Sequence, residues 1–290
     1  LCPDCRRGVE DIKEKNYFLK ISKYKIWLKN YLDDNKDFIQ PQSRFNEVYS
    51  FLENELNDLC ISRPKNRVSW GIPIPFDDNY VTYVWFEALL NYITAPGFLK
   101  SPDFNLTWPA DVHLMAKDIL RYHAVYWPIM LHMLGLEPPK TVFAHGWWLI
   151  EEGSKMSKSK GNAIDPCAFV EKYGTDSLRY FLLREISFGS DGSFSEQGFI
   201  KRVNSDLAND FGNLVFRTLN MVMKYYGGFI PENESAKSEC DSFFKDMVEN
   251  LNSRINNFMS KLDYQKALEC IWQLVTSANK YVEVKAPWNL

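Results

Sequence analysis

The chain has 290 residues, a hydrophobic share of 46% and a formal net charge of −3. This length favours about two domains, and the apolar share is sufficient for a buried core. The small net charge excludes a global basic field, so any contact with nucleic acid would be a local patch. No run of about 18 apolar residues is present, so we expect neither a transmembrane helix nor a membrane partner.

The N-terminal sequence LCPDCRRGVED has no initiator Met and lacks the apolar core of a signal peptide. We therefore expect a fragment, or a chain whose first part is not included. Cys2 and Cys5 have the CxxC spacing of one zinc knuckle, which would contribute two ligands to a structural Zn²⁺. The alternative is a coincidental turn, because no second CxxC or CxxH occurs later in the chain. The other four cysteines are scattered, which favours a reducing compartment.

Residues 17–32 and 45–59 alternate aromatic and charged residues at helical spacing. Within the second segment, Leu52, Leu56 and Leu59 repeat at i, i+4 and i+7, which predicts an amphipathic helix through all three. The segment around Pro41 between the two is predicted as a loop.

Residues 80–150 alternate strand-like and helix-like segments. Strands are predicted at 80–85, 111–116 and 141–150, and helices at 86–93 and 118–136. Such alternation is typical of a parallel sheet covered by helices, and ligands bind at the carboxyl ends of its strands. We expect one crevice formed by the residues at three strand ends, which are Val84, Trp85, Ala116, Lys117, Asp118, Ala144, His145 and Gly146.

The segment GSKMSKSKGNAIDP at 153–166 places three lysines on a loop bounded by glycines. Mobile ammonium groups suit a polyphosphate whose charge grows during a reaction, and the alternative is an exposed turn. Asp165 and Pro166 predict an N-cap and first helical residue, with a helix to Tyr173 that Gly174 ends. A second helix is predicted over 175–184, and a polar break at 188–198 separates it from the C-terminal part of the chain.

From about residue 195 only helices are predicted, over 195–226, 239–261 and 264–285, which indicates an antiparallel bundle. Asn209, Asn213 and Arg217 are spaced four apart and would lie on one helix face.

Eight short motifs occur in order along the chain: ISRPKNRVSWGIPIP (61–75), YVWFEALLNYITA (83–95), AKDILRYHAVYWP (116–128), HGWW (145–148), KMSKSKGN (155–162), YGTDSLRYFLLRE (173–185), RVNSDLANDFGNLVFR (202–217) and KAPW (285–288). KMSKS is letter for letter the second signature motif of class I aminoacyl-tRNA synthetases. Together the motifs make nearly the whole chain resemble the methionyl-tRNA synthetases of the bacterial or mitochondrial type.

This resemblance implies the second half of an α/β parallel-sheet, Rossmann-type nucleotide-binding domain, followed by an all-α anticodon-binding helix bundle. We expect residues 1–62 to end a connective insertion, 63–150 to form the second half of the catalytic domain, 151–194 to hold the KMSKS loop and stem-contact region, and 195–290 to form a C-terminally incomplete bundle. None of the four histidines lies in an HxGH sequence. We therefore expect the first half of the catalytic domain to be missing and the fragment alone to be inactive.

The activity implied by the resemblance is ATP-dependent formation of methionyl-adenylate, with Mg²⁺, and transfer of methionine to the 3′ end of tRNA(Met). Lys158 would stabilise the pyrophosphate leaving group with help from Lys155. Asp118 would accept hydrogen bonds from the ATP ribose, or be a helix N-cap, and Arg63 would lie near the phosphates, or be a surface arginine. The remaining ATP contacts would be His145, Gly146, Met156 and Ser157.

The methionine pocket implied by the resemblance takes two sets of residues from two helix starts. Their spacing places each set on one helix face, and the alternative is that they face the core. A histidine on an apolar face argues against the core, because it needs a hydrogen-bond partner. The sets are Trp85, Ala88, Leu89 and Tyr92, and Ile119, Tyr122 and His123.

For the bundle, the resemblance implies anticodon binding by Asn209, Asn213, Arg217 and Trp288, residue types suited to stacking on unpaired bases and hydrogen bonding to them. The alternatives are surface polar residues on a helix and a tryptophan that caps the bundle.

Three other functions stay open: a sibling class I synthetase for another apolar amino acid, a nucleotidyltransferase with the same lysine loop, and a catalytically inactive RNA-binding protein derived from a synthetase. The bundle disfavours the second, and the intact lysine loop and Asp118 disfavour the third. We expect a monomer or homodimer in the cytoplasm, or alternatively in the mitochondrial matrix.

Overall fold

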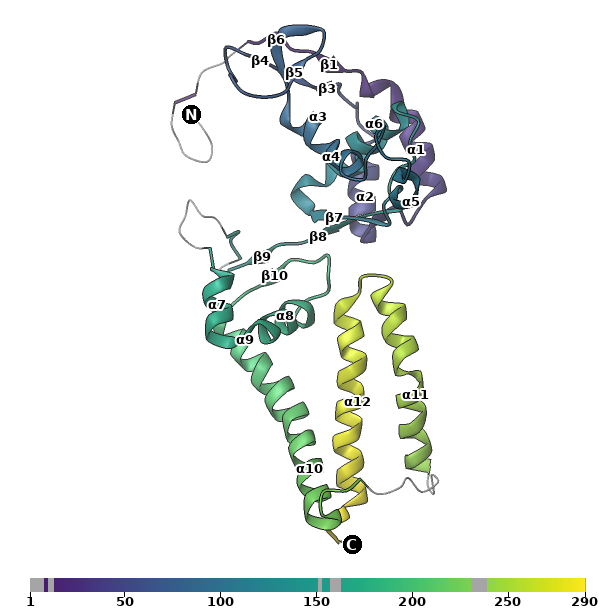
Figure 1. Cartoon of the computed structure of the whole chain (residues 1–290), viewed down its shortest axis with the longest axis vertical. Coiled ribbons are helices and arrows are strands. Elements are labelled where there is room, and N and C mark those ends of the chain that lie inside the picture. The colour runs from purple at the N-terminus through teal and green to yellow at the C-terminus, as the bar shows by residue number, and fades with distance from the viewer. Residues whose placement is uncertain (1–7, 10–12, 151–152, 157–162, 231–238, 290) are drawn as a thin grey trace. The chain divides into compact units, whose positions relative to one another are not determined.

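The computed structural model describes residues 8–9, 13–150, 153–156, 163–230 and 239–289. The chain divides into two compact units, Leu1–Ala144 and His145–Leu290 (Figure 1). The finer boundaries expected after residues 62, 150 and 194 stay predictions. Among the described helices, none combines the length and the apolar character that crossing a membrane requires.

Unit 1 is built from short helices. They are α1 (Lys25–Asp34), α2 (Gln42–Phe51), α3 (Val84–Leu89), α4 (Asn91–Thr94), α5 (Phe104–Thr107) and α6 (Trp127–Met133), with the 3₁₀ turns η1 (Ile21–Tyr24) and η2 (Lys117–Ile119) and the π-helical turn η3 (Tyr122–Tyr126). The single helix expected over 118–136 is therefore three successive segments, and the π turn changes the register of the side chains after it.

The parallel sheet of unit 1 contains β2 (Ile39–Gln40), β7 (Val112–Ala116) and β8 (Thr141–His145), in the order β2-β8-β7. β2 runs parallel to β8, with Ile39 opposite Val142. The strand expected at 111–116 is confirmed as β7. The strand expected at 141–150 is confirmed only over β8, because the chain leaves this sheet after His145, and Trp148–Leu149 form a separate strand in another sheet. Along β7, His113 and Met115 are buried whereas Val112 and Leu114 are exposed, because successive side chains of a strand point to opposite faces.

The third strand expected in this sheet belongs to a different one. β4 (Ser62–Pro64), β5 (Pro73–Ile74) and β6 (Asp77–Thr82) form an antiparallel sheet in the order β4-β6-β5. The strand predicted at 80–85 is therefore wrong in both extent and partner, since α3 begins at Val84. The physical reason is proximity in sequence: antiparallel strands pair through a tight turn, whereas parallel pairing needs a long crossover.

The leucine repeat predicts burial correctly and secondary structure wrongly. Leu52, Leu56 and Leu59 are 0%, 3% and 8% exposed. α2 ends at Phe51, however, and Leu59 lies in β3 (Leu59–Cys60), which pairs antiparallel with β1 (Phe18–Leu19). Helical spacing beyond Leu52 is coincidental, because the hydrogen bonds of β3 to β1 fix an extended backbone there.

Two buried clusters form the core of unit 1. One packs α1 and α2 against the parallel sheet and contains Leu28, Leu32, Phe45 and Val142 among others. The other packs α3, α4 and α5 against α6, and its members are Leu89, Ile93, Phe104, Trp108, Trp127, Met130 and Leu131.

Unit 2 begins with the parallel pair β9 (Trp148–Leu149) and β10 (Gly192–Ser193) and is otherwise helical where it is described. Its helices are α7 (Pro166–Tyr173), α8 (Thr175–Arg184), α9 (Glu196–Arg202), the π-helical η5 (Val203–Gly212), α10 (Asn213–Tyr226), α11 (Glu239–Met259), α12 (Tyr264–Lys285) and the 3₁₀ turn η6 (Pro287–Asn289). α9, η5 and α10 are continuous, so the helices predicted over 195–226, 239–261 and 264–285 are confirmed.

The helix ends in unit 2 are explained by local sequence. The Asp165 carboxylate accepts a hydrogen bond from the Cys167 backbone N–H at 2.9 Å, and Pro166 is the first residue of α7. Gly174 has φ +83°, which separates α7 from α8 without the strain that a side chain would impose. α11 and α12 form an antiparallel hairpin, and α12 also packs against α8 and η5 (Figure 1).

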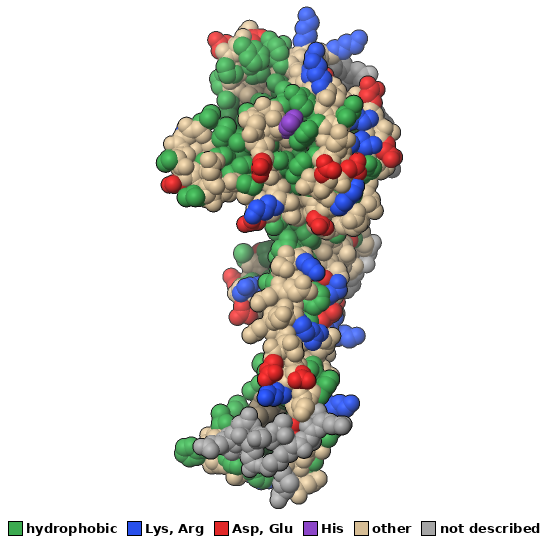
Figure 2. All heavy atoms as spheres, turned by 90° about the vertical axis from the view of Figure 1, so that its right-hand side faces the viewer, with side chains coloured by type: hydrophobic (Ala, Val, Ile, Leu, Met, Phe, Trp, Pro, Cys, Tyr) green, Lys and Arg blue, Asp and Glu red, His purple; other side chains and the backbone are tan. Residues whose placement is uncertain are grey.

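Charged side chains of both signs are interspersed on the face shown in Figure 2, with apolar side chains between them. This mixture agrees with the net charge of −3. A nucleic-acid interface on that face would therefore depend on a few residues and not on a broad basic field.

Candidate functional site

Aromatic and histidine side chains of α3, α4 and η3 contact one another in unit 1. The Trp85 ring stacks on Tyr122 with a centroid separation of 4.0 Å and an interplanar angle of 14°, and both residues are half-buried. The Tyr92 hydroxyl lies 3.0 Å from Nε2 of His123. The structure therefore brings together two pairs of the residues that the resemblance places in one pocket.

His123 is 2% exposed and is held at both ring nitrogens. Nδ1 lies 2.9 Å from the backbone oxygen of Ile119. Because a carbonyl oxygen only accepts, Nδ1 carries the proton, and Nε2 accepts from the Tyr92 hydroxyl. Burial lowers the pKa of His123, and the bond to Ile119 opposes this only in part. The group beside Tyr92 is thus a neutral imidazole in one tautomer.

The other predicted pocket residues divide between core and partly open positions. Leu89 is 1% exposed and belongs to the second core cluster. Ala88 and Ile119 are half-buried. Leu89 thus shows the burial expected of the core interpretation, and Ala88 and Ile119 keep part of their surface accessible.

Sequence reasoning missed His113, which is 5% exposed on β7. Its Nε2 accepts a hydrogen bond from the Trp127 indole N–H at 3.2 Å, and its ring lies 4.2 Å from the Tyr92 ring. Burial lowers the pKa of His113 to about 4, and the repulsion that would arise if His123 were also protonated acts in the same direction. The available signal was the alternation along β7, which places His113 on the same buried face as Met115.

Asp118 lies two residues beyond the end of β7 and is exposed. It is the second residue of η2, whose N-cap is Ala116. The interpretation of Asp118 as a helix N-cap is therefore wrong, because the N-cap position belongs to the residue that ends the strand.

Arg63 on β4 is half-buried and held by its neighbours. Its guanidinium lies 4.2 Å from the centre of the Tyr83 ring, and Nη1 donates to the Ser62 oxygen at 2.7 Å and to Cys60 Sγ at 3.0 Å. Arg63 and Arg67 line one open cavity on this unit. The Arg63 side chain is therefore not freely solvated.

Unit 2 holds the base of the lysine-rich loop. Lys155 forms an isolated antiparallel bridge with Leu149, and its ammonium group lies 3.8 Å from the centre of the Trp147 ring. Met156 is half-buried against the aromatic core of this unit. Ser157 and Lys158, also predicted site residues, lie outside the described residues.

The segment before the loop is closely packed. His145 Nδ1 lies 2.7 Å from the oxygen of Gly146, and the ring stacks on Phe188. A Cβ on Gly146 would collide with the backbone of Ser190 and Asp191, so only glycine fits there. Residues 145–147 are thus fixed against 188–191, which also positions the start of the loop.

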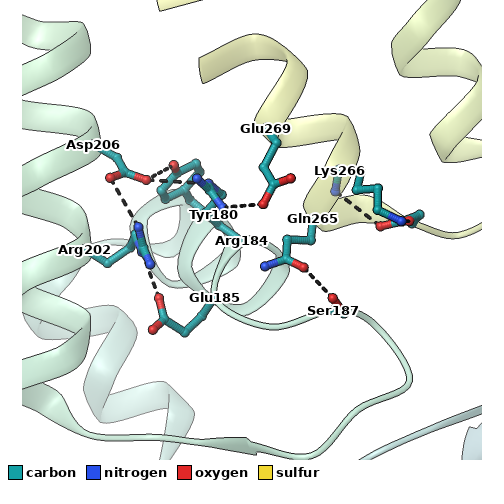
Figure 3. Close-up of polar contacts among 10 residues, drawn as sticks. Tyr180, Arg184, Glu185, Ser187, Arg202, Asp206, Gln265, Lys266 and Glu269 are labelled. Carbon is teal, nitrogen blue, oxygen red and sulfur yellow. Dashed lines mark hydrogen bonds and ion pairs between the residues drawn. The ribbon is translucent and has the colours of Figure 1, made fainter. Parts of the chain in front are cut away.

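A polar cluster lies between α8, η5 and α12 (Figure 3). The Tyr180 hydroxyl donates to Asp206 at 2.6 Å, and Asp206 is only 4% exposed. Arg184 and Arg202 approach the same carboxylate at 3.6 and 3.5 Å. Burial, with the bond to the Asp206 carboxylate, raises the pKa of Tyr180, so the phenol stays protonated.

The outer part of this cluster connects the end of α8 and the residues just after it to α9 and α12. Arg202 pairs with Glu185 at 2.8 Å, and Arg184 pairs with Glu269 of α12 at 3.3 Å (Figure 3). Ser187 donates to Gln265 of α12 at 2.6 Å. α8 is therefore bonded to the bundle through side chains as well as by packing.

At the far end of α12, the Arg217 guanidinium lies 5.8 Å from the centre of the Trp288 ring, which is 49% exposed. Asn209 and Asn213 are exposed. Asn209 belongs to the π-helical η5, so the four-residue spacing that aligns side chains on an α-helix holds only for Asn213 and Arg217. The structure thus brings two of the four predicted residues, Arg217 and Trp288, into contact.

The predicted zinc ligands Cys2 and Cys5 lie outside the described residues. Elsewhere in the described chain, no group of three or more His, Cys, Asp or Glu residues is arranged to hold a metal ion.

Comparison with known proteins decides the family. Residues 4–219 match the family model described as tRNA synthetases class I (M). This chain belongs to the class I methionyl-tRNA synthetase family. The methionine–tRNA ligases of Caldanaerobacter subterraneus subsp. tengcongensis and Clostridium acetobutylicum are 50% and 52% identical over the whole chain, and the chain covers 45% of each. It therefore spans less than half the length of these methionyl-tRNA synthetases.

A solved structure supports the same assignment. The methionyl-tRNA synthetase of Mycobacterium tuberculosis bound by methionyl-adenylate has a TM-score of 0.88 and 43% identity, over 95% of this chain and 54% of that one. The fold, with its parallel sheet and many helices, is accordingly that of the catalytic region of methionyl-tRNA synthetases.

Proposed function

We propose that this chain takes part in methionine–tRNA ligation, in which ATP and methionine form methionyl-adenylate and the methionyl group passes to the 3′ end of tRNA(Met). The observation that carries the proposal is the pairing of Trp85 with Tyr122 and of Tyr92 with His123. These pairs occur in a chain 43% identical to a structure bound by methionyl-adenylate.

The pocket suits a thioether side chain. Methionine offers a polarizable sulfur that packs well against aromatic rings and accepts only weak hydrogen bonds. In this proposal Trp85 and Tyr122 supply ring surface, Ala88 and Ile119 supply apolar surface, and neutral His123 adds a polar group without a charge. Few directed polar groups on a mainly apolar lining are typical of a site for such a ligand.

Adenylate formation needs positioning and neutralisation of phosphate charge. A methionine carboxylate oxygen attacks the α-phosphorus, and the bond to the pyrophosphate oxygen breaks. In this proposal Lys155 and Lys158 stabilise the leaving pyrophosphate as point charges. Arg63 also interacts with the phosphates and Asp118 accepts from the ribose hydroxyls. The remaining contacts to ATP come from His145, Gly146, Met156 and Ser157.

Mg²⁺ would accompany ATP and neutralise its phosphates. In the bundle, Trp288 would stack on an unpaired anticodon base, and Arg217, Asn213 and Asn209 would hydrogen-bond to bases. The contact between Arg217 and the exposed Trp288 ring supports this part, because it holds the ring at the surface with one face supported by a cation.

The test is amino-acid-dependent exchange of pyrophosphate into ATP. It is run on these 290 residues and on a polypeptide extended to the length of the relatives, because no HxGH sequence is present among the 290. We expect exchange with methionine from the longer polypeptide and none from the shorter. Lys158→Ala should abolish it. Lys172→Ala is the matched control, since Lys172 is an exposed lysine of α7 that pairs with Glu196 of α9.

The outcomes separate the alternatives. Exchange with another amino acid would keep the chemistry and refute the methionine pocket. No exchange with any amino acid, combined with binding of tRNA, would favour the catalytically inactive RNA-binding protein.

A further inference from the structure

His113 has no part in the roles proposed above, yet it lies at the centre of the aromatic cluster. It is buried on β7 and contacts residues from two helices, Tyr92 of α4 and Trp127 of α6. Each contact is directional. The imidazole accepts the Trp127 N–H through Nε2, and its ring lies against the Tyr92 ring at an interplanar angle of 35°.

Tyr92 in turn is hydrogen-bonded to Nε2 of His123, so the orientation of its ring decides where that hydroxyl points. Tyr92 is half-buried and hydrogen-bonded at its tip, while its ring is flanked by His113 at 4.2 Å and Trp127 at 6.0 Å. A side chain held at both ring and tip loses the freedom to rotate. The contacts run from Trp127 through His113 and Tyr92 to His123.

We propose that His113 is a positioning residue, which holds the Tyr92 ring so that its hydroxyl stays on Nε2 of His123 and thereby sets the shape and polarity of the methionine pocket. This inference rests on the proposed function of that pocket. His113 itself need not touch the amino acid, because Tyr92 and His123 are the groups that do.

An imidazole suits this position better than an apolar side chain of similar size. It must be flat to pack on Tyr92, and it must also offer an acceptor, since the Trp127 N–H is buried and would otherwise lack a partner. The neutral ring meets both needs without placing a charge in the core.

The test uses His113→Leu and His113→Gln in the polypeptide that supports methionine-dependent exchange. His113→Leu removes the acceptor and the flat ring. We expect the KM for methionine to rise about tenfold, the effect of a displaced pocket group, while the KM for ATP changes little. His113→Gln returns an acceptor to Trp127 and should lie between His113→Leu and the wild type.

Phe98→Leu is the control for a general loss of stability. It removes ring packing from the same core cluster, where Phe98 lies 5.3 Å from the Phe104 ring. We expect it to lower thermal stability and leave the KM for methionine unchanged. Equal effects of Phe98→Leu and His113→Leu on that KM would overturn the proposal, as would an unchanged KM in His113→Leu.

A second measurement holds even where His113→Leu folds poorly. In a Tyr92→Phe background, His113→Gln should no longer change the KM for methionine, because its effect passes through the missing hydroxyl. Nitrogen NMR of His123 in the 290-residue chain should show Nδ1 protonated in the wild type and mixed tautomers in His113→Gln. An unchanged tautomer would refute the positioning role, whereas absence of methionine-dependent exchange in the wild type would refute the proposed function instead.

Discussion

The hydrogen bond between Tyr180 and Asp206 should make a measurable contribution to the stability of unit 2. In Tyr180→Phe the hydroxyl that donates to a carboxylate at 2.6 Å is lost, in a site where that carboxylate is 4% exposed. A hydrogen bond to a charged group contributes about 1.5–3 kcal/mol. We expect the loss to lie within this range, because Asp206 keeps Arg184 and Arg202 at 3.6 and 3.5 Å and is not left without a cation.

Asp206→Ala should cost more, about 3–5 kcal/mol, since it removes the carboxylate shared by two partly buried arginines. Each arginine keeps one carboxylate, Glu269 for Arg184 and Glu185 for Arg202. These remaining pairs limit how much free energy of unfolding Asp206→Ala can remove. In the double variant the hydroxyl and the carboxylate are both gone. The two effects should therefore be less than additive, with a coupling of about 1.5–3 kcal/mol.

The assay is urea unfolding followed by far-ultraviolet circular dichroism, which reports on helices throughout the chain, including α11 and α12 of unit 2 with 21 and 22 residues. Tyr264→Phe is the control, since Tyr264 lies on α12 and packs against Phe188 through its ring at 5.1 Å. We expect that control to change the free energy of unfolding by less than about 0.5 kcal/mol. A Tyr180→Phe variant as stable as the control, or strict additivity of the two cluster variants, would refute the proposed strength of this bond.

Three further predictions rest on single contacts. Because burial lowers the pKa of His113 to about 4 from its ordinary 6.5, the unfolded chain binds the extra proton first as pH falls, so the free energy of unfolding should drop by about 3 kcal/mol between those values. The difference between wild type and His113→Phe in urea unfolding at each pH isolates this effect, and identical pH dependence would contradict it. Trp288→Ala should weaken binding of tRNA with a CAU anticodon by ~1–3 kcal/mol, the value of one lost base stack, and an unchanged dissociation constant would remove Trp288 from the interface. Asp165→Ala removes the cap bond to Cys167 and should lower the free energy of unfolding, measured in urea, by about 1 kcal/mol. Asp165→Asn still offers an acceptor and should keep most of that stabilisation in the same measurement.

The parts of the fold that sequence predicts well are those fixed by local rules. Asp165, Pro166 and Gly174 determine where α7 begins and ends, and the structure places those boundaries at the predicted residues. β7 likewise is predicted from a short apolar run. For α7 the responsible interactions join residues close together in the sequence, and for β7 the apolar run itself is local, so a short window contains the needed information.

Predictions failed where the partner of a segment decides its structure. Leu56 and Leu59 are apolar and buried as expected, but pairing of β3 with β1 overrides the helical spacing. Residues 80–85 have the composition of a strand, and nothing in that composition distinguishes a parallel from an antiparallel neighbour. Burial can thus be predicted at these positions, whereas the pairing that determines their secondary structure cannot.

The polar clusters show the same limit for the candidate site. Asp206 lies in a π-helical segment among exposed polar residues, and its sequence gives no sign that it is buried against Tyr180 from α8. His113 similarly has no motif of its own. Both act through contacts with elements distant in the sequence. A resemblance to a family predicts residues that touch a substrate, but the residues that hold them in place emerge only when the packed structure shows which buried polar atoms need partners.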